Sequence, residues 1–551
     1  MSKRYLITAR LIAAILVIIG SAGTYIMAAP AKAKPAAKKQ PRPKPYKKIA
    51  NKFITTIAEG KPNEAVKAAK AKLLEMPGDL ETLYSLAVAY SVLKQTDKAM
   101  EYVKQAVDAG LPFARFHAGP RNLLAPLTKS KAFRDFAAGH PVGLIHGPML
   151  GAMTDTSVKV WVRCATEMPV QVIASTGADT SSAVKSPLVK AQASRDFTAV
   201  AELTGLKADT TYHYQLIIDG KPVKIDPAPT FRTFPIKGSK TKFQVIFGGG
   251  AGYTPQYERM WNTLDKHRPL AYLAMGDNVY IDRPTSPETQ KYCYYRRQSR
   301  PEYRRFVSRT PVFSIWDDHD FGKNDCIGSA GIDDIPWKVP VWNVFKNNFV
   351  NPFYGGGDKQ PGVWYDFAIN GVHFIMLDCR YYRTSPKLPS PTMLGPVQKK
   401  WLFETLKASK ASGATFTVLA SSVPWAKGTK GGSKDTWDGF PEEREEIFSF
   451  IGKNHIEGVF LISADRHRSD AYKTERPGAY PLYEASSSKL TNVHTHRLIK
   501  TALFGYNAKC SFGLLSFDAT APDPKLTYDI YNIDDEKIHT LKVKRSELSF
   551  K

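Results

Sequence analysis

The chain has 551 residues, 43% of them hydrophobic and 11% aromatic, and a formal net charge of +26 at pH 7. It is too long for one ordinary hydrophobic core, which excludes a single-domain protein and predicts three or more domains. The positive charge favours anionic partners, without choosing among phosphates, nucleic acid and lipid.

Residues 1–31 have the features of an export signal or a membrane anchor. A basic start, "MSKRYLITAR", precedes an apolar run, and "AAPAKA" offers small residues for cleavage. The uncharged stretch from Leu11 to Ala31 is also long enough to span a bilayer, so an uncleaved anchor is the alternative to a cleaved signal. Either way, the positive-inside rule predicts an exported protein that is periplasmic, extracellular or anchored to the outer face of the cytoplasmic membrane.

Residues 32–49 are rich in Pro and Lys, which is typical of an extended basic linker that could lie on an anionic membrane surface. Residues 50–136 predict helices that repeat, because the stretches starting at Glu64 and Lys98 resemble each other at an offset of 34 residues. This period resembles that of tetratricopeptide repeats. So few repeats would form either a module that binds a protein partner or a plain helical bundle without one.

Residues 141–236 consist of short alternating segments broken by turn residues, which predicts a small all-β sandwich. The stretch "LTGLKADTTYHYQL" resembles the tyrosine-corner region of fibronectin type III domains, with Tyr212 as the corner residue. We expect this module to be a scaffold.

Residues 241–545 have an α/β pattern. Apolar runs recur, and each is followed by polar or glycine residues: "FQVIF", "LAYLAM", "PVFSI", "HFIML", "FTVLA" and "VFLIS". Continuous apolar runs are typical of strands covered on both faces. Because ligands bind at the carboxyl ends of such strands, we expect the polar residues that follow them to form one shared site.

Hard oxygen donors and imidazoles follow three of these runs. They occur in "GDN" at residues 276–278, "DDHD" at residues 317–320 and "DRH" at residues 465–467. Carboxylates crowded in this way need compensating positive charge. Without paired thiolates, the donor set suits Ca, Mn, Fe or Zn, and two such ions could polarise a phosphoryl oxygen and activate water.

Residues 243–500 resemble the PhoD-type alkaline phosphatase and phosphodiesterase family, within the calcineurin-like metallophosphatase superfamily. The matching motifs, in chain order, are "GDNVY", "WDDHDFGKND", "LDCRYYR", "LGPVQKKWL", "SSVPW", "WDGFPEER", "SADRHRSD" and "PLYEASSS". The resemblance implies an α/β fold with a metallophosphatase β-sandwich core flanked by helices, preceded here by the small sandwich and the helical repeat module.

The resemblance also implies the ligands of two or more metal ions. These are Asp277, Tyr280, Asp318, Asp320, Asn324, Asp465 and His467. Asp277 would bridge two ions, and Tyr280 would bind a ferric ion as a phenolate. Asp320 and Asn324 would hold a further, weakly bound cation or orient His319.

Three residues are implied to act on the substrate. His319 would bind phosphate or protonate the leaving oxygen. Arg380 and Arg383 would grip phosphate oxygens through bidentate donors, with a structural ion pair as the alternative for both.

The segment after the first strand departs from the family pattern. The family usually places a cysteine or aspartate ligand where this chain has "FGGGAGYTP". Gly248 to Gly252 offer no side-chain ligand, so we expect the ferric ion to be lost or held by other residues. The glycine run could also cradle phosphate through its backbone amides or serve only as a packed turn.

We therefore expect an exported metal-dependent phosphoesterase that hydrolyses phosphate monoesters or diesters with metal-activated water. The alternative is a non-catalytic extracytoplasmic adaptor or binding protein on a degenerate phosphatase fold, and a third interpretation is a hydrolase tuned to lipid phosphodiesters. No specific nucleic-acid module is recognisable, and the stretch "YRRQSRPEYRRF" is better explained as a solvated basic face. The five cysteines lack CxxC spacing, which argues against a structural zinc site but permits disulfides.

Overall fold

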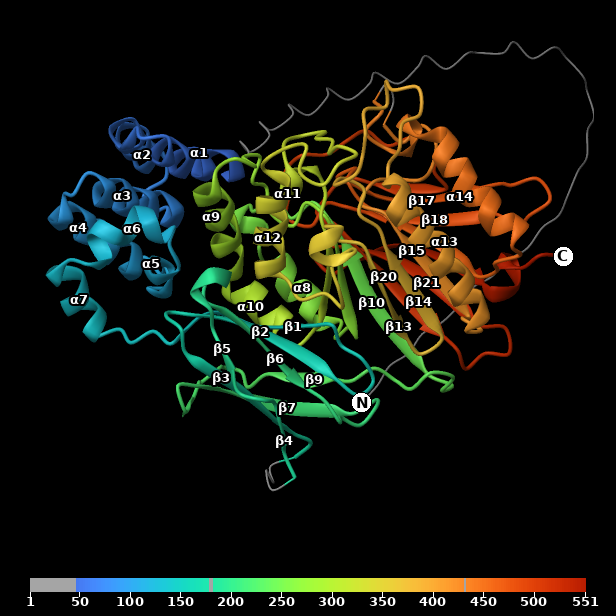
Figure 1. Cartoon of the computed structure of the whole chain (residues 1–551), viewed down its shortest axis with the longest axis horizontal. Coiled ribbons are helices and arrows are strands. Elements are labelled where there is room, and N and C mark those ends of the chain that lie inside the picture. The colour runs from blue at the N-terminus through green and yellow to red at the C-terminus, as the bar shows by residue number, and fades with distance from the viewer. Residues whose placement is uncertain (1–45, 178–181, 431–432) are drawn as a thin grey trace, which may run out of the picture. The chain divides into compact units, whose positions relative to one another are not determined.

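The computed structural model describes residues 46–177, 182–430 and 433–551 (Figure 1). The predicted signal or anchor at residues 1–31 and most of the predicted linker at residues 32–49 lie outside the described residues. In the described residues no helix is both long and apolar enough to cross a membrane. The five cysteines are all described, and all are free thiols rather than disulfides.

The N-terminal helices form a bundle around α3. Every residue of α3 from Glu81 to Ser91 is buried, and α1, α2, α4 and α6 all pack against it. Asp79 caps this helix, since its carboxylate accepts the backbone N–H of Thr82 at 3.0 Å. The two stretches with the 34-residue offset form α2 and α4. The bounds are α1 Tyr46–Ala58, α2 Pro62–Glu75, α3 Leu80–Val92, α4 Thr96–Asp108, α5 Ala114–Ala118, α6 Arg121–Thr128 and α7 Lys131–Ala138.

A buried ion pair within this bundle is linked by a hydrogen bond to the α/β part of the chain. Nη2 of Arg115 lies 2.9 Å from Oε2 of Glu81, and both side chains are almost inaccessible to solvent. The same carboxylate oxygen accepts the hydroxyl of Tyr292, in α9 (Pro287–Gln298), at 2.8 Å. Helix α1 also packs along α9 (Figure 1). The helical bundle therefore lies directly against the α/β part.

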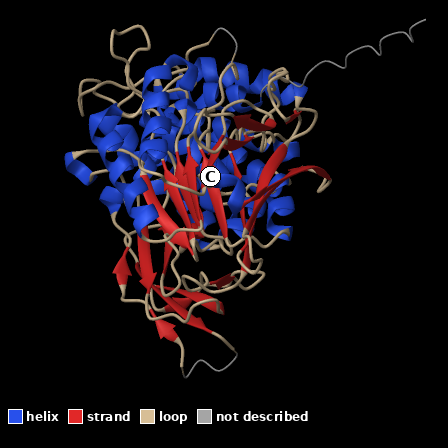
Figure 2. Cartoon of the chain, turned by 90° about the vertical axis from the view of Figure 1, so that its right-hand side faces the viewer, coloured by secondary structure: helices blue, strands red, loops and turns tan. Residues whose placement is uncertain are grey.

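Two large sheets form the core of residues 241–545. Their strand orders are β22-β21-β20-β10-β11-β12-β1-β2-β6 and β13-β14-β15-β16-β18-β17-β19. The sheets face each other, because Phe313 of β12 stacks on Phe367 of β13 with ring centroids 3.7 Å apart. Helices lie to both sides of the strands (Figure 2). This is the predicted sandwich core with flanking helices.

The bounds of the strands in the first sheet are β1 Leu144–Gly151, β2 Val158–Cys164, β6 Thr198–Leu203, β10 Lys242–Gly248, β11 Ala271–Met275, β12 Val312–Ile315, β20 Ser511–Asp518, β21 Lys525–Asn532 and β22 Lys537–Lys544. Those in the second are β13 Tyr365–Ile369, β14 Val372–Met376, β15 Phe416–Ala420, β16 Val459–Ser463, β17 Ser469–Thr474, β18 Leu482–Ser487 and β19 Phe504–Tyr506. The remaining α-helices of this part are α8 Met260–Lys266, α10 Pro301–Val307, α11 Asp318–Phe321, α12 Lys338–Asn348, α13 Gly395–Ala411 and α14 Pro441–Lys453.

The central strands of both sheets are parallel. Strands β10, β11 and β12 run in one direction, and so do β14, β15, β16 and β18 in the second sheet. Their carboxyl ends therefore lie at one edge of each sheet, as the sequence predicts. The segments that leave this edge carry the motifs identified above.

The β-rich residues 141–236 differ from a free-standing sandwich. Strands β1, β2 and β6 continue the nine-stranded sheet, since Gly151 of β1 pairs with Val312 of β12. A six-stranded sheet holds β3 Pro169–Ser175, β4 Val184–Lys185, β5 Val189–Lys190, β7 Thr211–Ile218, β8 Lys221–Pro222 and β9 Thr230–Arg232. The hydroxyl of Tyr212, the predicted corner residue, accepts the N–H of Lys207 at 2.9 Å.

The arginine-rich stretch lies in α9 and α10 and contributes to the interior. Arg296 and Arg297 are buried. Arg296 lies over the ring of Tyr253 at 4.2 Å, and Arg297 pairs with the carboxylate of Glu258. These two arginines are therefore not part of a solvated basic face.

The Arg115–Glu81 pair predicts a large effect of removing one partner. Arg115→Met leaves the carboxylate of Glu81 buried without its cation, so the free energy of unfolding should fall by about 3–5 kcal/mol in urea titrations. Lys131→Met removes a pair with Asp135 whose side chains are 83% and 61% exposed, and it should cost less than about 1 kcal/mol. Equal losses in the two variants would contradict this role for the buried pair.

Candidate active site

The turn after β11 is held by Asp320. Its carboxylate accepts the backbone N–H groups of Asn278 at 3.1 Å and Val279 at 2.9 Å. Burial raises the pKa of Asp320 to about 8, although these backbone donors oppose the rise. The predicted roles of Asp320 are to bind a weak cation or to orient His319, and its observed contacts hold the turn that carries Asp277.

Asp277, Asp318 and His319 meet at the carboxyl ends of β11 and β12. Ligand atoms of all three lie within 4.8 Å of one another. Asp277 is 2% exposed, and its Oδ2 accepts the hydroxyl of Tyr280 at 2.7 Å. Its other oxygen, Oδ1, is buried and has no hydrogen-bond partner among the described residues. A buried carboxylate oxygen without a donor is costly unless a cation compensates it, so this group fits a metal ion.

Both carboxylate oxygens of Asp318 accept a backbone hydrogen bond. Its Oδ2 accepts the N–H of Asp325 at 2.6 Å, and its Oδ1 accepts the N–H of His319 at 3.0 Å. Burial raises the pKa of Asp318 to about 6, and the positive charges of His319 and Arg380 oppose that rise. Each oxygen keeps a lone pair that could face a cation.

His319 is held as a proton donor. Its Nδ1 donates to Oδ1 of Asp282 at 2.5 Å, and its ring lies 4.3 Å from that of Tyr280 between centroids. Burial lowers the pKa of His319, but the nearby carboxylates, Asp318 and Asp277 foremost, outweigh this and raise it to about 10. The imidazolium form is therefore favoured beside the acids.

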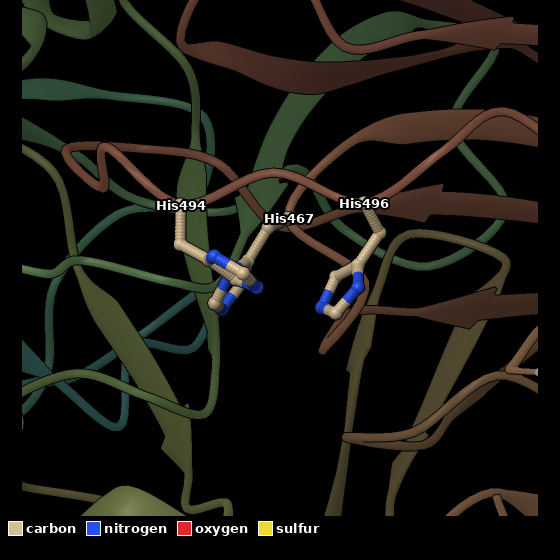
Figure 3. A group of neighbouring side chains, drawn as sticks. All are labelled: His467, His494 and His496. Carbon is tan, nitrogen blue, oxygen red and sulfur yellow. The ribbon is translucent and has the colours of Figure 1, made fainter. Parts of the chain in front are cut away.

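A second group of ligands consists of three imidazoles. Nitrogen atoms of His467, His494 and His496 lie within 4.8 Å of one another, and Figure 3 shows the three side chains extending from neighbouring segments. His467 follows β16, and its Nε2 lies 3.7 Å from Oδ2 of Asp277 and 3.0 Å from the hydroxyl of Tyr280. Imidazoles suit zinc, iron and similar ions better than calcium.

His494 and His496 are residues that sequence reasoning missed. They lie in "NVHTHR", just beyond the last family motif, and the spacing of two histidines around one residue was the available signal. Their segment is tied to His467, because the Thr495 hydroxyl donates to the carbonyl of His467 at 3.0 Å.

The glycine run after β10 makes room for this histidine-bearing segment. A Cβ on Gly250, whose φ is +67°, would lie 2.2 Å from the carbonyl oxygen of Ser488. The N–H of Gly249 donates to Ser487 at 3.1 Å, and the N–H of Leu490 donates to Gly249 at 3.2 Å. The two segments therefore pack backbone against backbone. The strand that lacks a ligand of its own thus lies beside a segment that supplies two.

Arg380 and Arg383, predicted to hold phosphate oxygens, instead bind carboxylates. Both are buried. Nε of Arg380 lies 2.6 Å from Oδ1 of Asp317, and Oδ1 of Asp435 lies 2.8 Å from Arg380 and 2.9 Å from Arg383. The two guanidinium groups hold the pKa of Asp435 well below its usual range despite its burial. The arginines therefore neutralise acids behind the site, which is the alternative role left open above.

Among the described residues, the remaining two predicted ligands, Asp465 and Asn324, supply no atom to these groups of ligand atoms. Asp465 nevertheless interacts electrostatically with His467. Asp465 pairs with its neighbour Arg466 at 3.3 Å. Asn324 is exposed, and the next residue, Asp325, forms a third group of ligand atoms with Asp318 and Asp435. Lys430 already lies 2.7 Å from Asp325 and 3.1 Å from Asp435, so that group has a cation of its own.

Comparison with known proteins finds a family that the α/β part resembles. Residues 245–494 match the model of the PhoD-like phosphatase family, residues 56–119 match a tetratricopeptide repeat model, and residues 142–236 match a domain of unknown function (DUF7800). Over 338 residues the chain is 24% identical to alkaline phosphatase D of Bacillus subtilis (strain 168), an alignment that covers 52% of this chain. The chain spans only 55% of the length of that relative.

Two solved structures have the same fold. A structure of PhoD superimposes with a TM-score of 0.58 at 18% identity, covering 73% of this chain and 91% of that one. The purple acid phosphatase PPD1 from yellow lupin (Lupinus luteus) seeds gives a TM-score of 0.55 at 11% identity, covering 74% and 76%. The predicted metallophosphatase fold is confirmed, and residues 245–494 are similar to the PhoD-like phosphatase family.

Proposed function

We propose that the protein is an exported, metal-dependent phosphoesterase of the alkaline phosphatase and phosphodiesterase type. The observation that carries this proposal is the position of Asp277, whose buried Oδ1 lacks a hydrogen-bond partner among the described residues. Asp277 lies between the oxygen ligand of Asp318 and the imidazoles around His467. The export step is supported by the signal-like sequence of residues 1–31.

Two ions fit these donors. Asp277 and Asp318 would hold one ion, with His319 beside them as the proton donor, and His467, His494 and His496 would hold the other. Ions bound there would polarise the phosphoryl oxygens and supply a water of lowered pKa. We assign the imidazole position to a zinc, iron or manganese ion, and calcium would suit only the carboxylate position.

The side chains around the ions have separate tasks. Tyr280 donates to Oδ2 of Asp277, so Oδ1 is the oxygen that would be available to an ion. Because Asp282 holds Nδ1 of His319, the opposite ring nitrogen is the one that delivers a proton to the leaving alcohol. Arg380 and Arg383 remain bound to acids and keep the acid cluster folded.

This arrangement favours an enzyme over a non-catalytic adaptor. The adaptor interpretation depended on a metal ligand lost at Gly248 to Gly252. His494 and His496 offer nitrogen donors beside that run, so the departure from the family pattern does not require a lost ion.

Asp277→Asn should remove activity without unfolding the protein. The loss of the shared carboxylate should lower hydrolysis of p-nitrophenyl phosphate and bis-p-nitrophenyl phosphate more than about 100-fold and lower the bound metal found by elemental analysis. The matched control is Asp366→Asn, which alters a carboxylate of β13 that pairs with His373. This variant should keep the hydrolytic activity and the bound metal. Full activity of the Asp277 variant would refute the assignment.

His319→Asn should slow hydrolysis by an amount that depends on the leaving group of the substrate. An alkyl phosphate needs a proton on its leaving oxygen and should lose about 10²–10⁴-fold in kcat. The p-nitrophenolate ion leaves without one, so that substrate should lose far less. Equal losses on both esters would argue that His319 binds phosphate instead of donating a proton.

His496→Ala should lower the content of transition metal selectively. The variant should retain calcium binding and lose about one equivalent of zinc, iron or manganese per chain, measured by elemental analysis after dialysis. Exposed His140, replaced in the same way, is the control. Unchanged transition-metal content in His496→Ala would exclude the imidazole group as a metal site.

A further inference from the structure

A cavity of about 480 Å³ lies beside His319, and helix α1 of the helical bundle forms one of its walls. Its volume falls within the range of about 300–1,000 Å³ that is usual for small-molecule sites. His319 and Tyr280 line the opposite wall, so the cavity adjoins the proposed metal centre on the side of the proton donor.

Helix α1 presents one face to this cavity. Lys48, Asn51, Lys52 and Thr55 line it, and their spacing of three, four and seven residues places them on one side of a helix. Asn51 donates to the carbonyl of Tyr280 at 2.5 Å, and the hydroxyl of Thr55 bonds that of Thr289 in α9 at 2.9 Å. These two buried contacts fix the helix, whereas the two lysines stay exposed.

The cavity lining is strongly positive. Lys48 and Lys52 lie on α1, and Arg283 and Lys323 lie on the opposite segments. Within the described part of the chain, none of these four side chains forms an ion pair with a carboxylate. The cavity's one acid, Asp282, already accepts the Nδ1 proton of His319. Clefts lined by unpaired cations attract anions and raise their local concentration.

We propose that this cavity binds a second phosphate, carried by the leaving alcohol of the substrate. The inference rests on the proposed function, because His319 is assigned to the leaving oxygen and also lines the cavity. A second phosphate on the alcohol would accept charge-assisted hydrogen bonds from these four cations, which a neutral alcohol would not. The cavity therefore favours small bisphosphorylated esters over esters of neutral alcohols. The helical bundle forms part of their binding site.

The test compares two substrates that differ only in the second phosphate. We expect the full chain with its metal ions to release phosphate from butane-1,4-diol bisphosphate with a kcat/KM at least tenfold above that for butyl phosphate. The double variant Lys48→Gln and Lys52→Gln should lower this ratio about tenfold. A control pair, Lys67→Gln and Lys104→Gln, alters exposed lysines of α2 and α4 outside the cavity and should keep the ratio.

A binding measurement separates this proposal from the proposed function. Binding is measured by calorimetry with the non-hydrolysable butane-1,4-diylbisphosphonate and butylphosphonate. The double variant should bind the bisphosphonate tenfold more weakly than the wild type does, and it should bind butylphosphonate as the wild type does. If the wild-type protein hydrolyses neither ester but binds the bisphosphonate selectively, the proposed activity is refuted and the proposed binding of a second phosphate in the cavity stands. The assignment of the cavity would be overturned if the wild-type ratio of the two kcat/KM values were near one. It would also be overturned if the double variant kept this ratio within twofold of the wild-type value.

Discussion

The structure depends on how the acids at the ends of β11 and β12 are balanced. Four aspartates gather there, and like charges in a buried space repel one another strongly. Cationic side chains neutralise part of this charge. Arg380 pairs with Asp317, and Arg380, Arg383 and Lys430 all pair with Asp435. Backbone donors satisfy Asp320. Arg380 also lies 3.9 Å from Asp318, whereas Oδ1 of Asp277 is buried without a hydrogen-bond partner among the described residues. The protein's own cations therefore leave Asp277 as the acid that best fits an external cation.

The glycine run after β10 lets the segment after β18 pack closely against it. Because Gly249 and Gly250 have no side chains, the segment after β18 can lie directly on their backbone. That contact carries His494 and His496 toward His467. In the proposed site, the segment after β18 thus offers nitrogen donors beside a glycine run that offers none.

Much of this arrangement could be predicted from the sequence. The apolar runs marked the parallel strands, and the rule that strand ends share an edge placed Asp277, Asp318 and His467 together. The partners of Arg380 could not be predicted, because Asp435 lies 55 residues away and no local pattern joins them. The continuation of the first sheet into β1 was equally hidden, since one pairing of Gly151 with Val312 leaves no periodic signal. Short-range patterns predict elements well, whereas ion-pair partners and sheet edges depend on contacts between distant segments.

Tyr280 connects the two ends of this architecture. Its hydroxyl donates to Asp277, and its backbone carbonyl accepts from Asn51 of the first helix. A single residue thus contacts both the helical bundle and Asp277 of the candidate site. A chain cut near residue 245, where the family match begins, would therefore lose the contact of Asn51 with the segment that carries Tyr280.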